Sequence, residues 1–184
     1  TAKASTNATI NLSASASGAY AINGNSGQDI ITGGSGNDTL KGEGANDTIK
    51  GEAGDDIITG GTGDDIITGG SGNDTFNVNS GIDAITDLSD GDILKITSGC
   101  TANATGITSF IATSASINNS DVNKGNLTAA SGGATIDLGL IASGSGFTVT
   151  GGAGADTLKG SSGNDIILGG NDSDTLQGNG GNDS

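Results

Sequence analysis

The sequence predicts an all-β fold in which short parallel strands wind into a flattened, right-handed coil, a parallel β-solenoid. A nine-residue unit repeats in unbroken register from Gly24 to Asn77 and starts again at Gly151. Glycine recurs at positions 1, 2 and 4 of the unit, which favours a turn, and a large apolar residue recurs at position 8, which favours a strand. The chain has 36 glycines, 2% aromatic residues and no Trp, Met or Pro. We therefore expect stability to come from stacked repeats rather than from a conventional core.

Each unit divides into a six-residue turn and a three-residue strand, and two units make one coil. Successive turns then fall on opposite edges, and units two apart stack at the ~4.8 Å spacing of neighbouring strands. One apolar residue per strand points inward at position 8. These residues are Ile31, Leu40, Ile49, Ile58, Ile67, Phe76 and Ile85 in the first array and Leu158, Ile167 and Leu176 in the second.

Position 6 carries an aspartate, and stacking brings the aspartates of one edge within a single coil step of each other. Their carboxylates would repel, and a cation between neighbouring turns would remove the repulsion. The candidate metal ligands are Asp29, Asp38, Asp47, Asp56, Asp65, Asp74, Asp83, Asp156, Asp165, Asp174 and Asp183. The turn backbone should add carbonyl oxygens at Gly33, Gly34, Gly36, Gly51, Gly54, Gly60, Gly61, Gly63, Gly69, Gly70, Gly72, Gly151, Gly152, Gly154, Gly169 and Gly170.

These oxygen ligands favour calcium. A flexible cage rich in carbonyl groups suits its variable geometry, whereas magnesium retains its waters and zinc or copper would need His or thiolate ligands. Neighbouring pairs in the columns give five sites in the first array and two in the second, about seven ions in all. The alternative is that these aspartates only form turns by bonding their own backbone, but the number of copies in register argues against it.

The clearest copies are GGSGNDTLK at 33–41, GGTGDDIIT at 60–68 and GGSGNDTFN at 69–77, which share the form GGxGxDxUx with U a large apolar residue. This form resembles the haemolysin-type nonapeptide repeat of the RTX family, and the resemblance covers about half of the chain. It implies a parallel β-roll, calcium as the ligand, export from a bacterium by a one-step route, and folding outside the cell.

Several units depart from the form. Ala45 and Asp172 occupy position 4 of their units, Val78 replaces the first glycine of its unit, and Asp183 lies beside the last residue of the sequence, so its site is expected to be incomplete. Acidic residues also occur at position 5, where we expect solvated charges rather than ligands. These are Asp55 and Asp64.

The repeats divide the chain into five segments. Tyr20 and Phe147 stand where the motif has Asp, so the segments before each array are predicted to be calcium-free caps. The insert between the arrays is expected to hold short, irregular strands and a helix near 108–115. The segments are capping strands at 1–23, a first array with closing strands at 24–96, a Ser/Thr/Ala/Asn-rich insert at 97–133, second capping strands at 134–150 and a second array at 151–184, open at its C-terminal end.

Composition excludes several functions. The formal charge of −15, with no Arg, argues against nucleic acid and anionic membranes as partners, and no apolar run is long enough for membrane insertion. Because the sequence contains no His, it can form neither a His-containing zinc motif nor a Ser-His-Asp triad, and we expect no enzyme activity.

Two hypotheses for function follow. The first is a secreted structural protein that polymerises head to tail with itself, resembling RTX-containing surface-layer or filament proteins, with cell-surface polysaccharide as a further candidate partner. The end of the second array in mid-unit favours it, because an uncovered coil could accept a neighbour's first coil near 6–12. The alternative is a calcium-dependent folding or secretion module of a larger toxin, enzyme or adhesin. An ice-binding solenoid ranks last, since positions 7 and 9 mix Thr, Lys and Ile.

Overall fold

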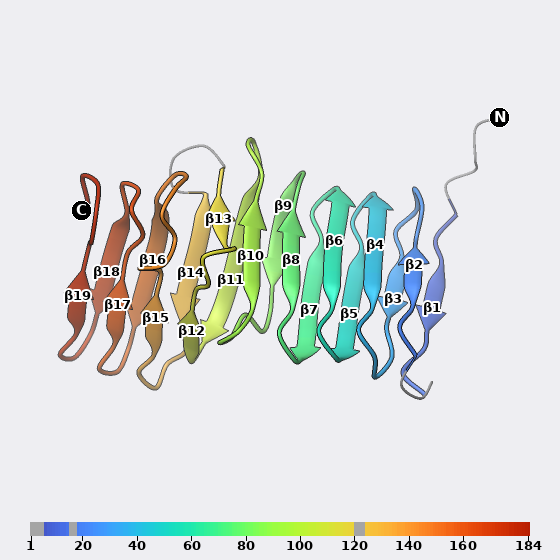
Figure 1. The fold of residues 1–184 in the computed structure, drawn as a ribbon, viewed down its shortest axis with the longest axis horizontal. Helices are drawn as coiled ribbons and strands as arrows, with labels where there is room; N and C mark the ends of the chain where they lie inside the picture. The colour runs from blue at the N-terminus through green and yellow to red at the C-terminus, as the bar shows by residue number, and fades with distance from the viewer. Residues whose placement is uncertain (1–5, 15–17, 120–123) are drawn as a thin grey trace.

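The chain winds into one elongated β-solenoid, with its two ends at opposite ends of the long axis (Figure 1). This computed structural model describes residues 6–14, 18–119 and 124–184, so parts of the predicted first cap and insert lie outside the described residues. Within these ranges all regular elements are strands, and every strand pairing is parallel. The predicted all-β parallel solenoid is confirmed.

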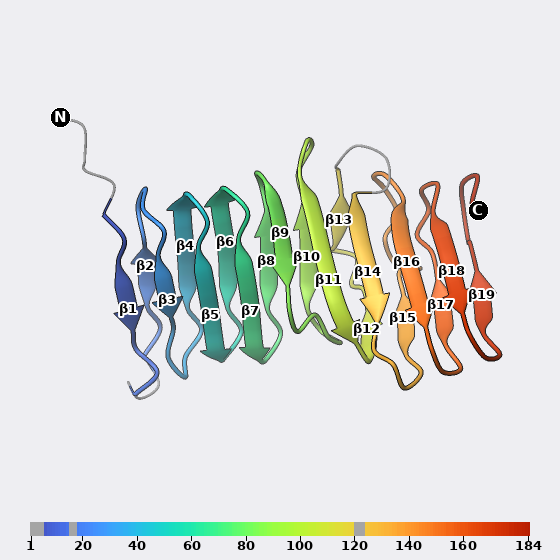
Figure 2. The same cartoon turned by 180° about the vertical axis from the view of Figure 1, so that it is seen from behind.

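A nine-stranded sheet runs along one face for the whole length of the solenoid (Figure 2). Its order follows the chain, with one strand for each coil. The strands are β1 (Thr9–Asn11), β3 (Ile30–Thr32), β5 (Thr48–Ala53), β7 (Ile66–Ser71), β9 (Ile82–Ile85), β11 (Thr101–Ile107), β14 (Gly125–Ala129), β16 (Phe147–Gly152) and β18 (Ile166–Gly170).

Two shorter sheets share the opposite face. The six-stranded sheet covers the N-terminal part, and the four-stranded sheet covers the C-terminal part. The first contains β2 (Ala21–Asn23), β4 (Thr39–Gly44), β6 (Ile57–Thr62), β8 (Thr75–Val78), β10 (Ile93–Ile96) and β13 (Ile117–Asn118). The second contains β12 (Ser109–Ile111), β15 (Thr135–Asp137), β17 (Thr157–Lys159) and β19 (Thr175–Gln177).

The repeat sets the register within the arrays. Ile31 pairs with Ile49 and Ile49 with Ile67, so each coil advances by two nine-residue units. The position-8 side chains from Ile31 to Phe76 are fully buried between the two faces. Leu176 differs from the prediction because its side chain is 49% exposed, and no following coil packs on it among the described residues.

The segment 97–133 continues the solenoid. Strand β11 pairs with β9 of the first array, and β14 pairs with β16, which leads into the second array. The helix predicted near 108–115 is wrong, because β12 lies there and pairs with β15. Phe110 points into the core between the partly exposed Ser109 and the exposed Ile111, so stacking against a neighbouring strand outweighs local helix propensity.

No helix in the described part of the chain is long and apolar enough to cross a membrane.

Candidate metal centres

The structure brings the predicted aspartates of one edge together in a column. The backbone N–H of Asp29 donates to Oδ1 of Asp47 at 2.7 Å, and that of Asp47 donates to Oδ1 of Asp65 at 2.8 Å. Asp65 donates in the same way to Asp83 at 3.2 Å. Each carboxylate thus binds the backbone of the preceding coil. All four side chains are buried.

The opposite edge holds a second column with the same hydrogen bonds. The N–H of Asp38 donates to Oδ1 of Asp56, and the N–H of Asp56 donates to Oδ1 of Asp74. The column continues to Asp92, whose Oδ1 accepts the N–H of Asp74 at 2.8 Å. Sequence reasoning missed Asp92 as a member of this column. The signal was available, because Asp92 lies 18 residues after Asp74, where the motif requires Asp.

The second array repeats the arrangement in two shorter columns. The N–H of Asp156 donates to Oδ1 of Asp174, and the N–H of Asp165 donates to Oδ1 of Asp183. Asp156 and Asp165 are buried, whereas Asp174 is half-buried and Asp183 is exposed. The residues nearest the end of the described chain are thus the least enclosed.

The second carboxylate oxygen, Oδ2, faces a different environment. In several of these residues it is buried without a hydrogen-bond donor, which is costly for an ionised group. These residues are Asp29, Asp47, Asp56, Asp65, Asp83 and Asp156. Oδ2 of Asp38 accepts the N–H of Gly34, and Oδ2 of Asp165 accepts the N–H of Ser161, each at 2.7 Å. The orphaned oxygens leave a position for a cation.

A glycine at position 1 faces five of these six oxygens, and Val78 occupies that position in the unit of Asp83. A Cβ on Gly42 would lie 2.5 Å from the carbonyl oxygen of Gly60 and would collide with Oδ2 of Asp47. Six glycines combine an Oδ2 of their own unit with a carbonyl of the next coil. They are Gly24, Gly33, Gly42, Gly51, Gly151 and Gly160. Three of them, Gly24, Gly42 and Gly160, were absent from the predicted turn set although they occupy the same position of the repeat.

Other predicted glycines have a conformational role. Gly61, Gly63, Gly70 and Gly72 have positive φ angles, which L-residues rarely adopt. Gly54, Gly152, Gly154 and Gly170 share this conformation.

The cradles fit calcium by their chemistry. In the described residues no three His, Cys, Asp or Glu side chains converge on one point, so side chains alone do not form a metal cage. Each cradle combines a carboxylate oxygen with backbone carbonyl oxygen from the next coil. Hard oxygen donors drawn largely from the backbone are the ligands that calcium takes in proteins. When bound, calcium would supply the positive charge that the buried carboxylates lack.

The buried carboxyl groups are poor acids. Burial, assisted by repulsion from neighbouring aspartates in the column, raises the pKa of Asp47 and of Asp56 to about 6. The same causes raise the pKa of Asp74 and of Asp83 to about 7. The N–H donor from the preceding coil lowers each pKa without offsetting the burial. Near neutral pH the ion-free columns therefore carry unfavourable charge.

The position-5 acids lie outside the columns. Asp55 and Asp64 are exposed. Oδ1 of Asp55 accepts the N–H of Asn73, and Oδ1 of Asp64 accepts the N–H of Ile82. These bonds run from a side chain to the following coil, opposite in direction to those of the position-6 columns.

The units that depart from the motif keep its backbone. Ala45 adopts a φ of 70° and Asp172 a φ of 75°, the left-handed conformation that glycine would provide. Val78 is fully buried in the core. One unit later Asp87 stands at position 1, and its carboxylate accepts the N–H groups of Gly69 and Gly70. Asp87 therefore caps the turn of Gly69 and Gly70 at the point where the position-1 glycines of the first array end.

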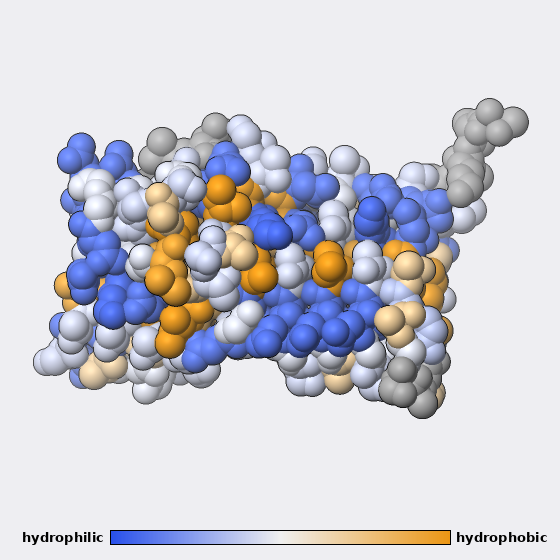
Figure 3. Space-filling view, viewed as in Figure 1, coloured by the Kyte–Doolittle hydropathy of each residue, from blue (hydrophilic) through white to orange (hydrophobic). Residues whose placement is uncertain are grey.

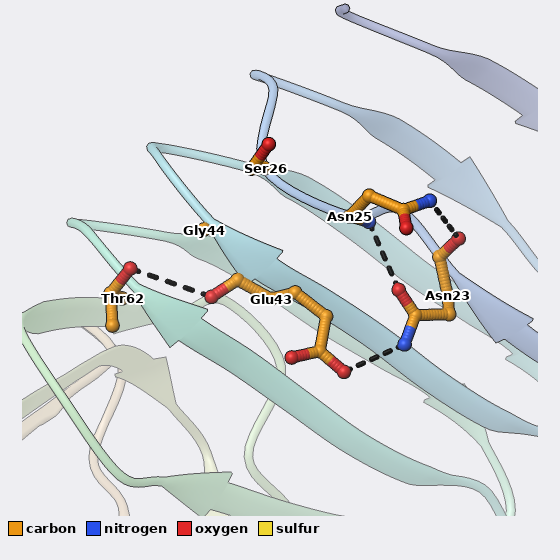
Figure 4. Close-up of a pocket in the computed structure, with 6 residues that line it drawn as sticks. All are labelled: Asn23, Asn25, Ser26, Glu43, Gly44 and Thr62. Carbon is orange, nitrogen blue, oxygen red and sulfur yellow. Dashed lines mark hydrogen bonds between the residues drawn. The ribbon is translucent and has the colours of Figure 1, made fainter. Parts of the chain in front are cut away.

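A shallow polar depression lies on the surface, away from the motif aspartates (Figure 4). Nδ2 of Asn23 donates to Oε1 of Glu43 at 2.6 Å, and Oγ1 of Thr62 donates to the carbonyl oxygen of Glu43 at 3.4 Å. Glu43 has a φ of 78° at position 2 of its unit, where other units carry glycine. Its carboxylate belongs to the surface and not to a cradle.

Comparison with known proteins agrees with this geometry. Residues 23–58, 50–85 and 150–184 match the family model described as the RTX calcium-binding nonapeptide repeat, and together they make up just over half of the chain. No curated protein and no solved structure matched the chain.

Substitution of a cradle glycine tests the site. Gly42→Ala should lower the number of bound calcium ions by one or two, because the new Cβ occupies the space between Asp47 Oδ2 and the Gly60 carbonyl. Calcium stoichiometry is measured by isothermal titration calorimetry. Gly132→Ala is the matched control, since a Cβ there meets no atom within 4 Å. Equal stoichiometry in both variants would contradict the cradle assignment.

Acid should partly replace calcium. The folded pKa values of about 6 to 7 lie above the ordinary value of 3.8, so protonation favours the fold. This stabilisation is complete below about pH 4 and is lost as the pH rises through 6 to 7. Calcium-depleted protein should therefore gain β-structure in circular dichroism between pH 7 and pH 4, about the span between folded and ordinary pKa values. A flat or falling signal would show that the carboxylates are not buried in the ion-free chain.

Proposed function

Because the chain belongs to the RTX calcium-binding nonapeptide-repeat family, we propose that it is a secreted bacterial structural module that folds outside the cell when calcium enters its turns. The observation that carries this proposal is the set of six buried Oδ2 atoms without a donor, four of which lie beside a glycine cradle. Without a cation these oxygens oppose folding, and with one they join neighbouring coils. Ion binding and folding are then a single event.

The expected affinity fits a switch between two compartments. Extracellular calcium modules commonly have dissociation constants of ~10⁻⁴ to 10⁻³ M, so a chain of this kind stays unfolded at intracellular calcium and folds outside. An unfolded chain with a net charge of −15 would also remain soluble before export. The number of bound ions, about seven from the aspartate pairs, is part of the proposal.

We further propose that the folded protein assembles with copies of itself into a surface layer or filament. In the nine-stranded sheet, the end strands β1 and β18 each have one neighbouring strand in the described part of the chain. The N–H of Ile167 in β18 already donates to the carbonyl oxygen of Ser184, so β1 and the remainder of β18 offer an edge for pairing. A head-to-tail contact between unlike ends propagates into a filament. We assign no catalytic role, because the sequence contains no His to serve as a base or zinc ligand.

Cell-surface polysaccharide is the second proposed partner. The depression around Asn23, Glu43 and Thr62 offers amide, carboxylate and hydroxyl groups for sugar hydroxyls.

Charge substitution separates column aspartates from surface aspartates. Asp56→Asn keeps an oxygen that can accept the Asp38 N–H but removes the charge beside the cradle, and it should raise the calcium concentration at half folding by roughly tenfold or more. Asp64→Asn is the control, because the Asp64 carboxylate is exposed and accepts a hydrogen bond from the N–H of Ile82, which an asparagine oxygen can also accept. We expect its calcium concentration at half folding to change by less than about twofold. Both midpoints are read from circular dichroism during calcium titration. Equal shifts would refute the special role of position 6.

Electron microscopy during calcium titration tests assembly. Ordered filaments or sheets should form together with the β-signal and dissolve on chelation. Removal of 178–184 should abolish the polymer while leaving the calcium-induced β-signal, because the Gly178 carbonyl of the last cradle and the carboxylate of Asp183 are lost but the preceding coils remain. A chain that folds with calcium and stays monomeric would instead be a folding module of a larger protein.

A further inference from the structure

The inward column that carries acids in the arrays becomes apolar between them. Asp83 is in register with Ala102, Ala102 with Gly125, and Gly125 with Phe147. The acids then resume, since the N–H of Phe147 donates to Oδ1 of Asp165. Between Asp83 and Asp165, the described members of this column therefore present neither the buried charge nor the cradle that calcium would satisfy.

The buried polar groups of the central coils are neutral and have partners. Oγ of Ser116 accepts the N–H of Leu94, and Nδ2 of Asn118 donates to the carbonyl oxygen of Gly146. None of the orphaned buried oxygens found in the described residues lies between 93 and 155. Of the buried polar groups that the structure describes in this segment, none needs an ion to be satisfied.

The central coils also hold most of the apolar core. Fifteen of the 26 buried apolar residues found in the described part of the chain lie in 93–150, under a third of its length. Two central strands bury more side chains than an array unit, which buries one and a glycine: β10 buries Leu94 and Ile96, and β11 buries Ala102, Ala104 and Ile107. Hydrophobic residues also gather at the surface over β12 and β15 (Figure 3). Ile111 of β12 and Leu140 are among the exposed large apolar residues.

We propose that residues 93–119 and 124–150 form a calcium-independent core, and that the two arrays fold outward from it in opposite directions as calcium binds. On one side β11 offers a paired template to β9. On the other side the N–H groups of Ala134 and Phe147 hold Oδ1 of Asp156 and Asp165, the first aspartates of the second array. A preformed neighbour removes the cost of starting a coil, because each added coil then gains its interface at once. The core would start the folding of both arrays whether or not the folded chain then polymerises.

Hydrogen exchange on the full chain, followed by mass spectrometry, tests the proposal. In chelator, amides of β10, β11, β14 and β15 should exchange at least about tenfold more slowly than those of β3 to β7, β17 and β19, which should exchange as in an unfolded chain. Calcium should then protect the arrays, beginning with β9 and β18. Uniform exchange in chelator, or protection of an array before the centre, would overturn the proposal.

A matched pair of variants locates the effect. Ile49 and Leu127 are fully buried in the same inward row of the nine-stranded sheet, one in an array and one in the centre. Leu127→Ala should remove the chelator-resistant protection and raise the calcium midpoint of both arrays by roughly two- to threefold, because the lost stability is divided among the several ions that bind on folding. Ile49→Ala should leave that protection intact and raise the midpoint of the first array only. If the two variants behave alike, the centre has no special role.

Discussion

The stacking of buried aspartates is the constraint on which the solenoid depends. Each position-6 carboxylate binds the backbone N–H of the preceding coil through Oδ1, so the carboxylates connect the coils directly. The same packing removes Oδ2 from water and raises the pKa of the group. The position-6 aspartate therefore has two opposing effects. Its Oδ1 joins neighbouring coils, whereas its buried Oδ2 disfavours their stacking unless a cation is bound.

The glycine content follows from this constraint. In each unit that forms a cradle, position 1 must lack a Cβ, because Oδ2 and a carbonyl of the next coil occupy that space. Positions 2 and 4 require positive φ in several turns, and where Glu43 or Ala45 replaces glycine the backbone keeps that conformation. A second set of bonds, from position-5 side chains such as Asn37 and Asp55, ties the same turns together in the opposite direction. The same few residues must therefore form the turn, leave space beside Oδ2 and hydrogen-bond to the neighbouring coils.

The chain divides its stability between two physical sources. The arrays bury one large apolar side chain per unit beside carboxylate oxygens that lack donors, whereas the central coils bury Phe110, Phe147 and several aliphatic residues. The nine-stranded sheet runs through the arrays and the central coils, so a folded coil of either kind can pair with the next coil of the other kind. An elongated fold whose coils touch only their neighbours permits this division, because its stability is nearly a sum of local interfaces.

The sequence by itself determined the coil, its 18-residue step in the arrays, the two edges and the aspartate columns, because the motif repeats in step with the solenoid. It did not determine the central segment, where the pairings of Ala102 and Gly125 depart from that step and conceal the inward column. It also missed the place of Asp92 and predicted a helix where Phe110 packs as a strand. Only the tertiary structure decided these points and which carboxylate oxygens are left without donors, because each depends on what the neighbouring coil places against the residue.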